Sequence, residues 1–429
     1  MSKIEGIIKK INTGNNSIFT ELYGTNQTVL NEQFQRYSTL INEFQNTFKS
    51  NNIELFSSPG RTEIGGNHTD HNHGRVLAAA VNLDNIAVAA KNNSNFIHIK
   101  STGYPAFKVD MSDLTPKKEE LYTSEALVKG IVARFKELGF EVGGFDMCNE
   151  SRVPKGSGLS SSASFEVLIG AVINHLFNCG RMDAVENAKV GQWAENNFFG
   201  KPCGLMDQTA CSVGGLITID FENPLNPLVK AIEFDFLSTG YSLVITDVGG
   251  GHDDAASQEE YASLPVEMKK VASQLGAKVL REVTLEQIIE KIPEMREQTG
   301  DRAILRAIHF QGDNKRVVQQ VDALKNNNFD AFLKMVIESG QSSYMYNQNI
   351  YDITHKDEQV VSLALALSEL VLKGKGAWRV HGGGFGGTIQ AFVPDNLIEK
   401  YVSTLEHVYG KGSCHKLFIR NKGAIKLDI

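Results

Sequence analysis

Apolar residues recur along this chain with a helical period in three segments. Between Glu125 and Leu138 they fall on one face, and Gly139 follows, which predicts an amphipathic helix that ends there. Residues Ala163 to Phe177 are apolar on nearly every side, which predicts a helix that is largely buried. Residues 395–409 also have helical spacing.

Other segments have the period or composition of β-strands. Residues 85–102 alternate on both sides of a polar turn at 92–95, which predicts a β-hairpin. A β-branched run at 241–248 is typical of an interior strand, and 416–419 is predicted to be the last strand. Because helices and strands alternate irregularly, we expect an α+β fold and not a regular βαβ array.

The length of 429 residues, with 41% hydrophobic and 22% charged residues, is ordinary for a globular protein. Domains commonly hold roughly 100–200 residues, so we expect two, 1–214 and 215–429, divided near the Gly-Gly pair at 214–215. The net charge of −7, with both signs interspersed, argues against nucleic acid as a partner.

The cysteines and the apolar runs indicate the compartment. Five scattered cysteines without a CxxC pair argue against a disulfide framework and against a structural zinc site. The first residues lack the apolar run of a signal peptide, and no uninterrupted apolar stretch reaches the ~20 residues that a membrane span needs. We therefore expect a cytoplasmic protein with no membrane partner. The sequence favours a monomer without determining the oligomeric state.

A glycine- and serine-rich segment, Pro154–Ala163, leads directly into the predicted buried helix. Glycines allow a tight turn and a close approach to a ligand, and a helix N-terminus favours a phosphate. The alternative is a plain serine cap after a turn. The segment is not a Walker A loop, because no GK[ST] follows, and it lacks the third glycine of a dinucleotide fingerprint.

A second motif, Ser58–His71, combines charged and polar side chains with glycines that interrupt any simple helix. Such a set suits hydrogen bonding to a ligand with many hydroxyl groups. Two alternatives are an exposed polar loop and a metal site that uses His68, Asp70, His71 and His73. The placement of these four residues has no recognised ligand spacing, so a sugar is favoured over a metal.

Two further segments complete the candidate chemistry. Residues 381–387 carry five glycines around one phenylalanine between strand-like runs, which indicates a tight loop or close backbone approach. In the segment 195–208, Asp207 follows a Gly-Leu-Met turn. It could cap a helix that starts at Gln208, or it could accept a hydroxyl proton; Glu195 would be a surface residue or a magnesium ligand.

Together the four segments resemble the GHMP kinase superfamily and look most like its galactokinase family. The family motif GRVNLIGEHTDY corresponds to GRTEIGGNHTDH here, GAGLSSSAS to GSGLSSSAS, and GGGFGG is intact. The pattern ENxFxGxxCGxMDQ matches residues 195–208, and the matches run in the family's order from about residue 57 to residue 388.

The resemblance implies a two-domain fold with the active site in the cleft between the domains. It implies a reaction of ATP with α-D-galactose to give ADP and α-D-galactose 1-phosphate, with Mg²⁺ as cofactor. It also implies catalytic roles for Arg61 and Asp207, sugar contacts at Asn67, His68, Asp70, Gly204 and Tyr261, ATP contacts at Gly156, Ser157, Gly158, Leu159, Ser160, Ser161, Ser162 and Ala163, and magnesium contacts at Ser162 and Glu195.

Two departures from the family pattern bear on the substrate. Asn67 stands where the family has a sugar-reading Glu, and His71 stands where it has Tyr. A neutral Asn would also tolerate a carboxylate at that carbon, and the related galacturonokinase carries a similar HxDH pattern, so galacturonate is an alternative substrate. A non-catalytic galactose sensor is a third possibility, but such relatives lose residues of the glycine-serine motif that this chain retains.

Overall fold

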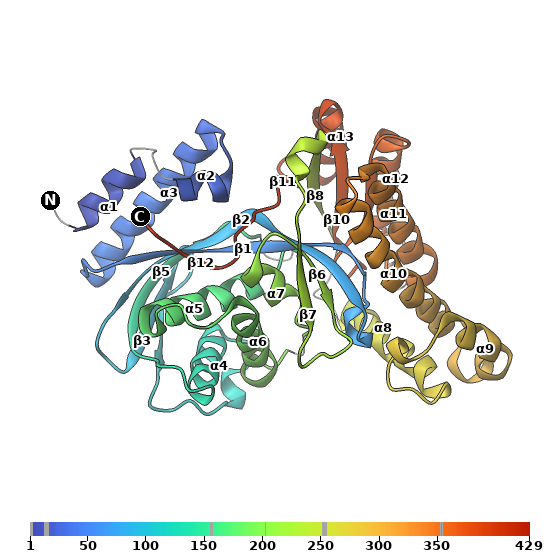
Figure 1. Cartoon of the computed structure of the whole chain (residues 1–429), viewed down its shortest axis with the longest axis horizontal. Coiled ribbons are helices and arrows are strands. Elements are labelled where there is room, and N and C mark those ends of the chain that lie inside the picture. The colour runs from blue at the N-terminus through green and yellow to red at the C-terminus, as the bar shows by residue number, and fades with distance from the viewer. Residues whose placement is uncertain are drawn as a thin grey trace.

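The structure is a computed structural model of the whole chain, and it describes residues 3–12, 17–154, 158–201, 203–250, 255–351, 353 and 355–429. Figure 1 shows an α+β molecule with a large sheet at one end and a smaller sheet with long helices at the other. This agrees with the predicted fold class.

The strands within the described residues are β1 (Glu54–Gly65), β2 (Arg75–Lys91), β3 (Phe96–Ser101), β4 (Phe107–Asp110), β5 (Phe145–Ser151), β6 (Leu216–Asp220), β7 (Leu228–Ile232), β8 (Tyr241–Gly249), β9 (Ala377–His381), β10 (Gly387–Pro394), β11 (Cys414–Leu417) and β12 (Ile425–Leu427). The α-helices are α1 (Lys3–Asn12), α2 (Ser17–Tyr23), α3 (Gln27–Phe48), α4 (Ser124–Glu137), α5 (Ser161–Asn178), α6 (Ala184–Ala194), α7 (Met206–Val213), α8 (Ala255–Gln274), α9 (Leu285–Thr299), α10 (Asp301–Lys325), α11 (Phe329–Ser342), α12 (Val360–Leu372) and α13 (Ile398–Tyr409). Short helical turns are η1 (Asp70–Asn72), η2 (Lys118–Glu120), η3 (Glu195–Phe199), η4 (Phe236–Thr239), η5 (Leu280–Glu282), η6 (Ser343–Asn347) and η7 (Asp395–Leu397).

The large sheet has eight strands and is organised by the long strand β2. One edge of β2 pairs with β1, and the other pairs with β6 near its start and with β5 near its end. The strand order is β12-β1-β2-β5-β3-β4, with β7 added beyond β6. All described pairings are antiparallel except the one between β3 and β5.

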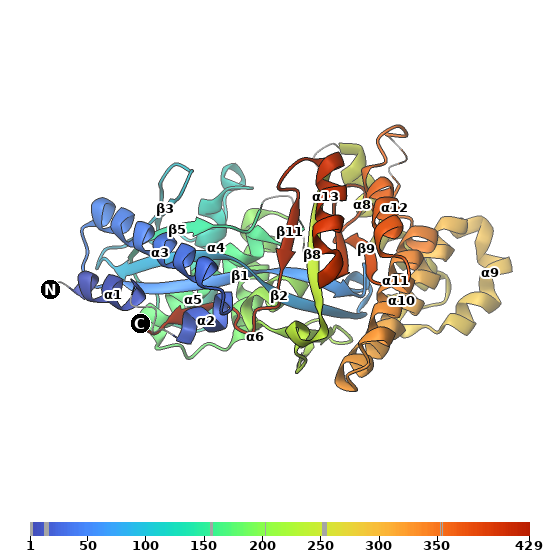
Figure 2. The same ribbon diagram turned by 90° about the horizontal axis from the view of Figure 1, so that it is seen from above.

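Helices cover both faces of the end of this sheet that contains β5. On β2, Ala87 and Ala89 face a core shared with α4, α5 and α6, whereas Ile86, Val88 and Ala90 face a core shared with α1, α2 and α3. Alternate side chains of a strand point to opposite faces, so a strand buried on both sides must be apolar at consecutive positions. Figure 2 shows α3 lying across the strands of this sheet.

The second sheet contains four antiparallel strands in the order β11-β8-β10-β9. One of its faces packs with α12 and α13, and the other packs with α10 and α11. The second of these cores also includes Leu77, Ala79 and Val81 of β2, so the long strand contributes to the cores of both halves of the molecule.

Several predicted elements are confirmed. The two predicted helices of the first half are α4 and α5, and the predicted helix at 395–409 is η7 followed by α13. The predicted interior strand is β8, which pairs with β11 on one side and with β10 on the other.

The predicted hairpin at 85–102 is wrong, although both of its strands form. Strand β5 pairs with β2 and with β3, so it lies between the two strands of the expected hairpin. Phe145, Met147 and Cys148 of β5 are fully buried, and together they contribute to the cores on both faces of the sheet. An interior position for β5 therefore removes more apolar surface from water than an edge position would.

The end of the chain also differs from the prediction. The strand expected at 416–419 is β11, which ends at Leu417, and Ile419 forms only an isolated bridge with Val81. The last strand is β12, which pairs with β1 in the large sheet. Strands β6 and β7 also lie beyond residue 214 and join the large sheet. Sheet pairing therefore does not change at 214–215, and the division into domains at that point stays a prediction.

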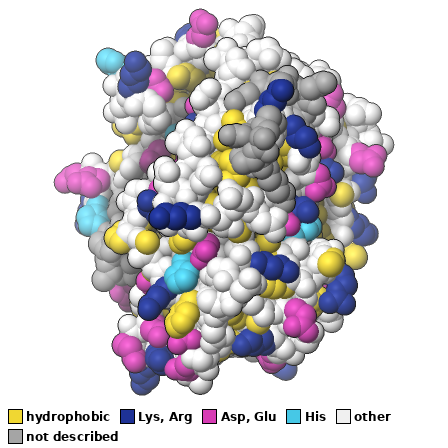
Figure 3. Space-filling model, turned by 90° about the vertical axis from the view of Figure 1, so that its left-hand side faces the viewer, with side chains coloured by type: hydrophobic (Ala, Val, Ile, Leu, Met, Phe, Trp, Pro, Cys, Tyr) yellow, Lys and Arg dark blue, Asp and Glu magenta, His cyan; other side chains and the backbone are white. Residues whose placement is uncertain are grey.

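Figure 3 shows the face of the molecule at the N-terminal end, where the acidic and basic side chains of the described residues are interspersed and form no basic stripe. In the part of the chain that the structure describes, no helix is both long and apolar enough to cross a membrane.

A buried cluster of charges joins the N-terminal helices to the large sheet. The Asp84 carboxylate accepts hydrogen bonds from Arg36 at 2.5 Å, from Tyr23 at 2.6 Å and from Arg420 at 3.1 Å. Ser57 of β1 also donates to it. Burial acts to raise the pKa of Asp84, but Arg36 and Arg420 lower it more, so the net pKa lies below the ordinary value.

We expect Asp84→Asn to destabilise the fold by about 3–5 kcal/mol, because it leaves buried guanidinium groups without their carboxylate. Urea unfolding followed by fluorescence measures the change. The control is Glu369→Gln, which removes an exposed ion pair with Lys373 and should change stability by about 0–1 kcal/mol. An equally small change in Asp84→Asn would contradict the assigned role.

Candidate active site

Three of the four sequence motifs meet at the carboxylate of Asp207. Arg61 of β1 donates from Nε to Asp207 Oδ1 at 2.7 Å, and Arg61 Nη2 lies 2.7 Å from the same oxygen. Ser160 donates to the other oxygen, Oδ2, and Arg61 also donates to the Gly158 carbonyl. The Asp207 side chain keeps 33% of its surface exposed, so it is held from two sides and remains accessible.

The position of Asp207 excludes a capping role. Helix α7 begins at Met206, its N-cap residue is Leu205, and no side chain caps it. Asp207 is therefore a helical residue in the first turn, where a negative charge is favourable. Burial acts to lower the pKa of Arg61, but the charge and the hydrogen bond of Asp207, together with smaller effects of Cys211 and Glu63, outweigh it, so the net pKa is raised.

The glycine-serine segment leads into helix α5 through a left-handed residue, Ser160, with φ of 57°. No side chain caps α5, so the cap expected under the alternative interpretation is absent at Ser160. The first backbone N–H groups of this 18-residue helix have no intrahelical acceptors. Ser160 directly precedes these N–H groups and donates a hydrogen bond to Asp207, so the start of α5 lies close to that carboxylate. Gly156 and Ser157 lie outside the described residues.

The glycine-rich segment at 381–387 packs directly against the glycine-serine segment at 154–163. A Cβ atom at Gly158 would lie 2.9 Å from Thr388 Oγ1 and 3.0 Å from His381 Nδ1, so only glycine fits this position. His381 in turn lies 3.1 Å from the Thr62 hydroxyl through Nε2 and 2.9 Å from the Thr388 hydroxyl through Nδ1. The loop at 382–387 is therefore held between core strands and is not a free hairpin tip.

The predicted sugar-contacting residues gather next to Asp207. A Cβ atom at Gly204 would lie 2.5 Å from Asp70 Oδ2, which shows how closely the backbone approaches that carboxylate. Tyr261 of α8 lies edge-on to His68 with ring centres 5.5 Å apart, and it packs against Gly383. The structure thus brings together residues from β1, α7, α8 and three loops.

The electrostatics support this grouping. The Tyr261 side chain is 43% exposed, but the protein atoms packed around its hydroxyl raise the pKa of that group, Asp70, Asp207 and Glu63 raise it further, and Arg61 lowers it. Charges act in this way only over short distances or in poorly solvated surroundings. The Tyr261 hydroxyl therefore lies in a site where negative charge predominates.

Asn67 is placed differently from the other predicted sugar contacts. Its side-chain Nδ2 donates to Glu63 at 3.0 Å and to the Gly382 carbonyl at 2.8 Å. Its Oδ1 accepts from Ser343 at 3.1 Å and from Asn349 at 2.9 Å. An Asn side chain has two donor hydrogens and two acceptor lone pairs, so all four are used inside the protein. Direct contact between Asn67 and a sugar stays a prediction, and this geometry does not favour it.

Sequence reasoning missed two charged residues beside Asn67. The buried Glu63 forms an ion pair with the buried Arg379 at 2.7 Å. Burial raises the pKa of Glu63, while Arg379 and Arg61 act to lower it. Glu63 lies within the second motif, at a position where the family pattern has Asn, so this departure from the pattern could have identified it. Arg379 lies 316 positions further along the chain, and nothing in the sequence pairs the two residues.

The two predicted magnesium positions differ in exposure. Glu195 is buried at the start of η3, and its Oε2 accepts from Gln208 at 2.9 Å; Ser162 is exposed in the first turn of α5. Gln208 also donates to Glu166, whose other carboxylate oxygen is buried without a hydrogen-bond partner. Burial and the charge of Glu195 raise the pKa of Glu166. Carboxylate and hydroxyl oxygens are the donors that Mg²⁺ prefers, so Glu195 and Ser162 fit this ion chemically.

No group of three or more His, Cys, Asp or Glu side chains that could hold a metal ion occurs among the described residues. The alternative metal site at His68, Asp70, His71 and His73 is therefore not assembled.

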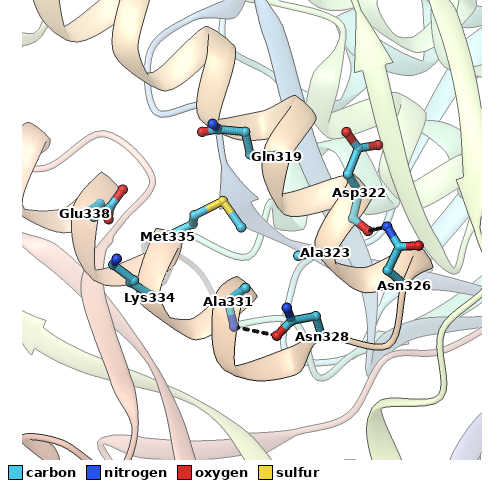
Figure 4. A pocket seen from close by; sticks show the side chains of 9 residues that line it. All are labelled: Gln319, Asp322, Ala323, Asn326, Asn328, Ala331, Lys334, Met335 and Glu338. Carbon is cyan, nitrogen blue, oxygen red and sulfur yellow. Dashed lines mark hydrogen bonds between the residues drawn. The ribbon is translucent and has the colours of Figure 1, made fainter.

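A cavity of about 400 Å³ lies elsewhere, between α10 and α11, and its lining contains none of the motif residues (Figure 4).

Comparisons with known proteins agree with these motifs. The family description "GHMP kinases N terminal domain" matches residues 126–215, and "Galactokinase galactose-binding signature" matches residues 42–91. The chain is 30% identical to a galactokinase of Clostridium tetani over 378 residues, which are 87% of this chain and 92% of that protein. It is 31% identical to a galactokinase of Glaesserella parasuis over 378 residues, 86% of this chain and 92% of the relative.

Solved structures give the same result. Lactococcus lactis galactokinase complexed with galactose superimposes with a TM-score of 0.78 at 25% identity, covering 91% of this chain and all of that one. A mevalonate kinase superimposes with a TM-score of 0.60 at 15% identity, covering 86% of this chain and 99% of that one, and it shows a shared fold.

We expect His68 to stay neutral from about pH 5.5 to about pH 8, because burial lowers its pKa to about 4. Its proton should reside on Nε2, which lies 2.9 Å from the Gly383 carbonyl. Long-range ¹H–¹⁵N NMR of the imidazole groups, assigned with a His68→Gln variant, tests both statements. A His68 signal that titrates near pH 6.5 would contradict them.

Proposed function

Since this chain belongs to the galactokinase family, we propose that it transfers the γ-phosphoryl group of ATP to the anomeric hydroxyl of galactose. The products are ADP and galactose 1-phosphate. The observation that carries the proposal is the position of Asp207. Its carboxylate is oriented by Arg61 and Ser160, lies beside the open N-terminus of α5, and shares its surroundings with Asp70 and Tyr261.

Asp207 is the proposed acceptor for the proton of the sugar O1 hydroxyl. Phosphoryl transfer requires a hydroxyl aligned with the phosphate, and a carboxylate within hydrogen-bond reach orients that hydroxyl and takes its proton. Two nitrogens of Arg61 lie at Asp207 Oδ1, whereas Oδ2 accepts from Ser160 and has a second lone pair. The proposed O1 hydroxyl can therefore bond to Asp207 without displacing the groups that hold it.

The phosphate groups of ATP are assigned to the start of α5. The free backbone N–H groups and the helix dipole at this end attract negative charge, and the residues from Gly156 to Ala163, a loop that continues into the first turn of α5, are the proposed phosphate contacts. Arg61 supplies a fixed positive charge between this loop and Asp207, since it donates to both.

Ser162 and Glu195 are the proposed protein contacts for Mg²⁺. This ion commonly binds through one or two protein oxygen ligands together with the phosphates of its nucleotide. When bound, it supplies positive charge that offsets the negative charge developing on the transferred group. Gln208, next to the proposed base, holds Glu195 through a 2.9 Å hydrogen bond.

The sugar is assigned to the region beside Asp207 where His68, Asp70, Gly204 and Tyr261 lie. A carboxylate accepts hydrogen bonds from sugar hydroxyls, and imidazole and phenol groups can donate or accept them. The retained Arg61, Ser162, Ala163 and Asp207 favour an enzyme over a non-catalytic sensor. We also propose a cytoplasmic location, as expected from the sequence.

A panel of hexoses and hexuronic acids with ATP and Mg²⁺ tests the proposed function. We expect ADP release with galactose, and the phosphate on carbon 1 when the product is analysed by ³¹P and ¹³C NMR. The absence of ADP release with every sugar, while ATP and galactose still bind, would support the non-catalytic sensor instead. A product with the phosphate on another carbon would contradict the assigned orientation.

We expect Asp207→Asn to lower turnover at least about 10²–10⁴-fold, because the hydroxyl proton loses its acceptor. The nucleotide should still bind, which calorimetry with ATP measures independently of catalysis. Asp110→Asn is the matched control, since Asp110 is an exposed carboxylate outside the site. Near-normal turnover in Asp207→Asn would rule out the proposed base.

A further inference from the structure

Glu63 is a buried acid that the proposed mechanism does not use. It lies on β1 two positions after Arg61, with 4% of its surface exposed. Its Oε1 accepts from Arg379 Nη2 at 2.7 Å and from Asn67 Nδ2 at 3.0 Å. Burying a carboxylate is costly, and the ion pair reduces this cost without removing the charge from the site.

Glu63 and Asn67 have exchanged an acid and an amide relative to the family motif. In GRVNLIGEHTDY the family has Asn at the position of Glu63 and Glu at the position of Asn67. In this chain the two side chains are hydrogen-bonded to each other, so the exchange occurs within a single contact. The neutral Asn67 therefore does not remove the negative charge from this part of the site, because Glu63 carries it instead.

The charges around the proposed sugar pocket do not balance. Three carboxylates, Glu63, Asp70 and Asp207, face two guanidinium groups, Arg61 and Arg379. Glu63 is close enough to act on Arg61 and on Tyr261. Asn67, which donates to Glu63, also donates to the Gly382 carbonyl and directly precedes His68, and Tyr261 packs against His68 and Gly383, so Glu63 lies directly behind the residues of the proposed sugar site.

We propose that Glu63 makes this site select a neutral hexose over the corresponding hexuronic acid, with Asn67 and Arg379 as the residues that position its carboxylate. The inference rests on the proposed sugar kinase function. A hexuronic acid would bring a further carboxylate into a site where negative charge already predominates, and like charges repel each other there. The hydroxymethyl group of galactose carries no such penalty.

The test is Glu63→Gln, which keeps an acceptor for Arg379 and Asn67 and removes only the charge. The ratio of kcat/KM for galactose to kcat/KM for galacturonate should fall by at least about tenfold, because Arg379 then adds an unbalanced positive charge. Binding of each sugar, measured by calorimetry, should show the same shift. Glu63→Asp, which retains the charge, should keep a ratio near that of the wild type.

Glu369→Gln is the control, because Glu369 is an exposed acid on α12 that pairs with Lys373, and its loss should leave the ratio unchanged. An unchanged ratio in Glu63→Gln would overturn the inference, and so would an equal loss with both sugars, which indicates a structural role. If Glu63→Gln does not fold, a Glu63→Asp ratio that matches the wild type supports the inference and a tenfold lower one overturns it. A wild-type chain that phosphorylates neither sugar would instead refute the proposed function.

Discussion

The site depends on the buried hydrogen bonds of Asn67. Besides its four side-chain bonds, its backbone N–H donates to Asp313 at 2.8 Å and its carbonyl oxygen lies 2.9 Å from His309 Nε2. Five of its six partners lie beyond residue 300, on α10, on η6 and in the loops around 349 and 382. All donors and acceptors of Asn67 are paired, and a buried polar residue paired in this way favours one arrangement of the two halves. That arrangement places Tyr261 and the glycine-rich loop opposite Arg61 and Asp207.

A rigid frame stands behind this network. Strand β2 contributes to cores on both faces of the large sheet and to the core shared with the second sheet. Asp84 of β2 joins two N-terminal helices, β1 and the C-terminal segment through one carboxylate. Arg61 lies on β1 opposite Ala80 of β2, so its backbone is held inside the large sheet. Catalytic groups supported in this way keep their geometry without reorganisation.

Much of this could be predicted from the sequence, and the remainder could not for identifiable reasons. Helices α4, α5 and α13 follow from local periodicity, and the motifs around Arg61, Ser160 and Asp207 follow from spacing and resemblance. The hairpin prediction failed because no local pattern shows that β5, some fifty residues later, separates β2 from β3. The pairing of Glu63 with Arg379, and three of the four hydrogen bonds of the Asn67 side chain, are contacts across more than 270 positions. Such pairings are decided by tertiary packing and leave no periodic signal.

The position of β12 affects how the chain folds while it is synthesised on the ribosome. Residues 425–427 pair with β1, and Arg420 reaches the carboxylate of Asp84, so the last part of the chain completes the sheet that carries Arg61. The edge of β1 that β12 covers therefore stays unpaired until residues 425–427 have been synthesised. Contacts between such distant segments form slowly, and an unpaired strand edge exposed meanwhile is prone to aggregate. The first half of the chain leaves the ribosome early but cannot complete this sheet until residues 425–427 have been released.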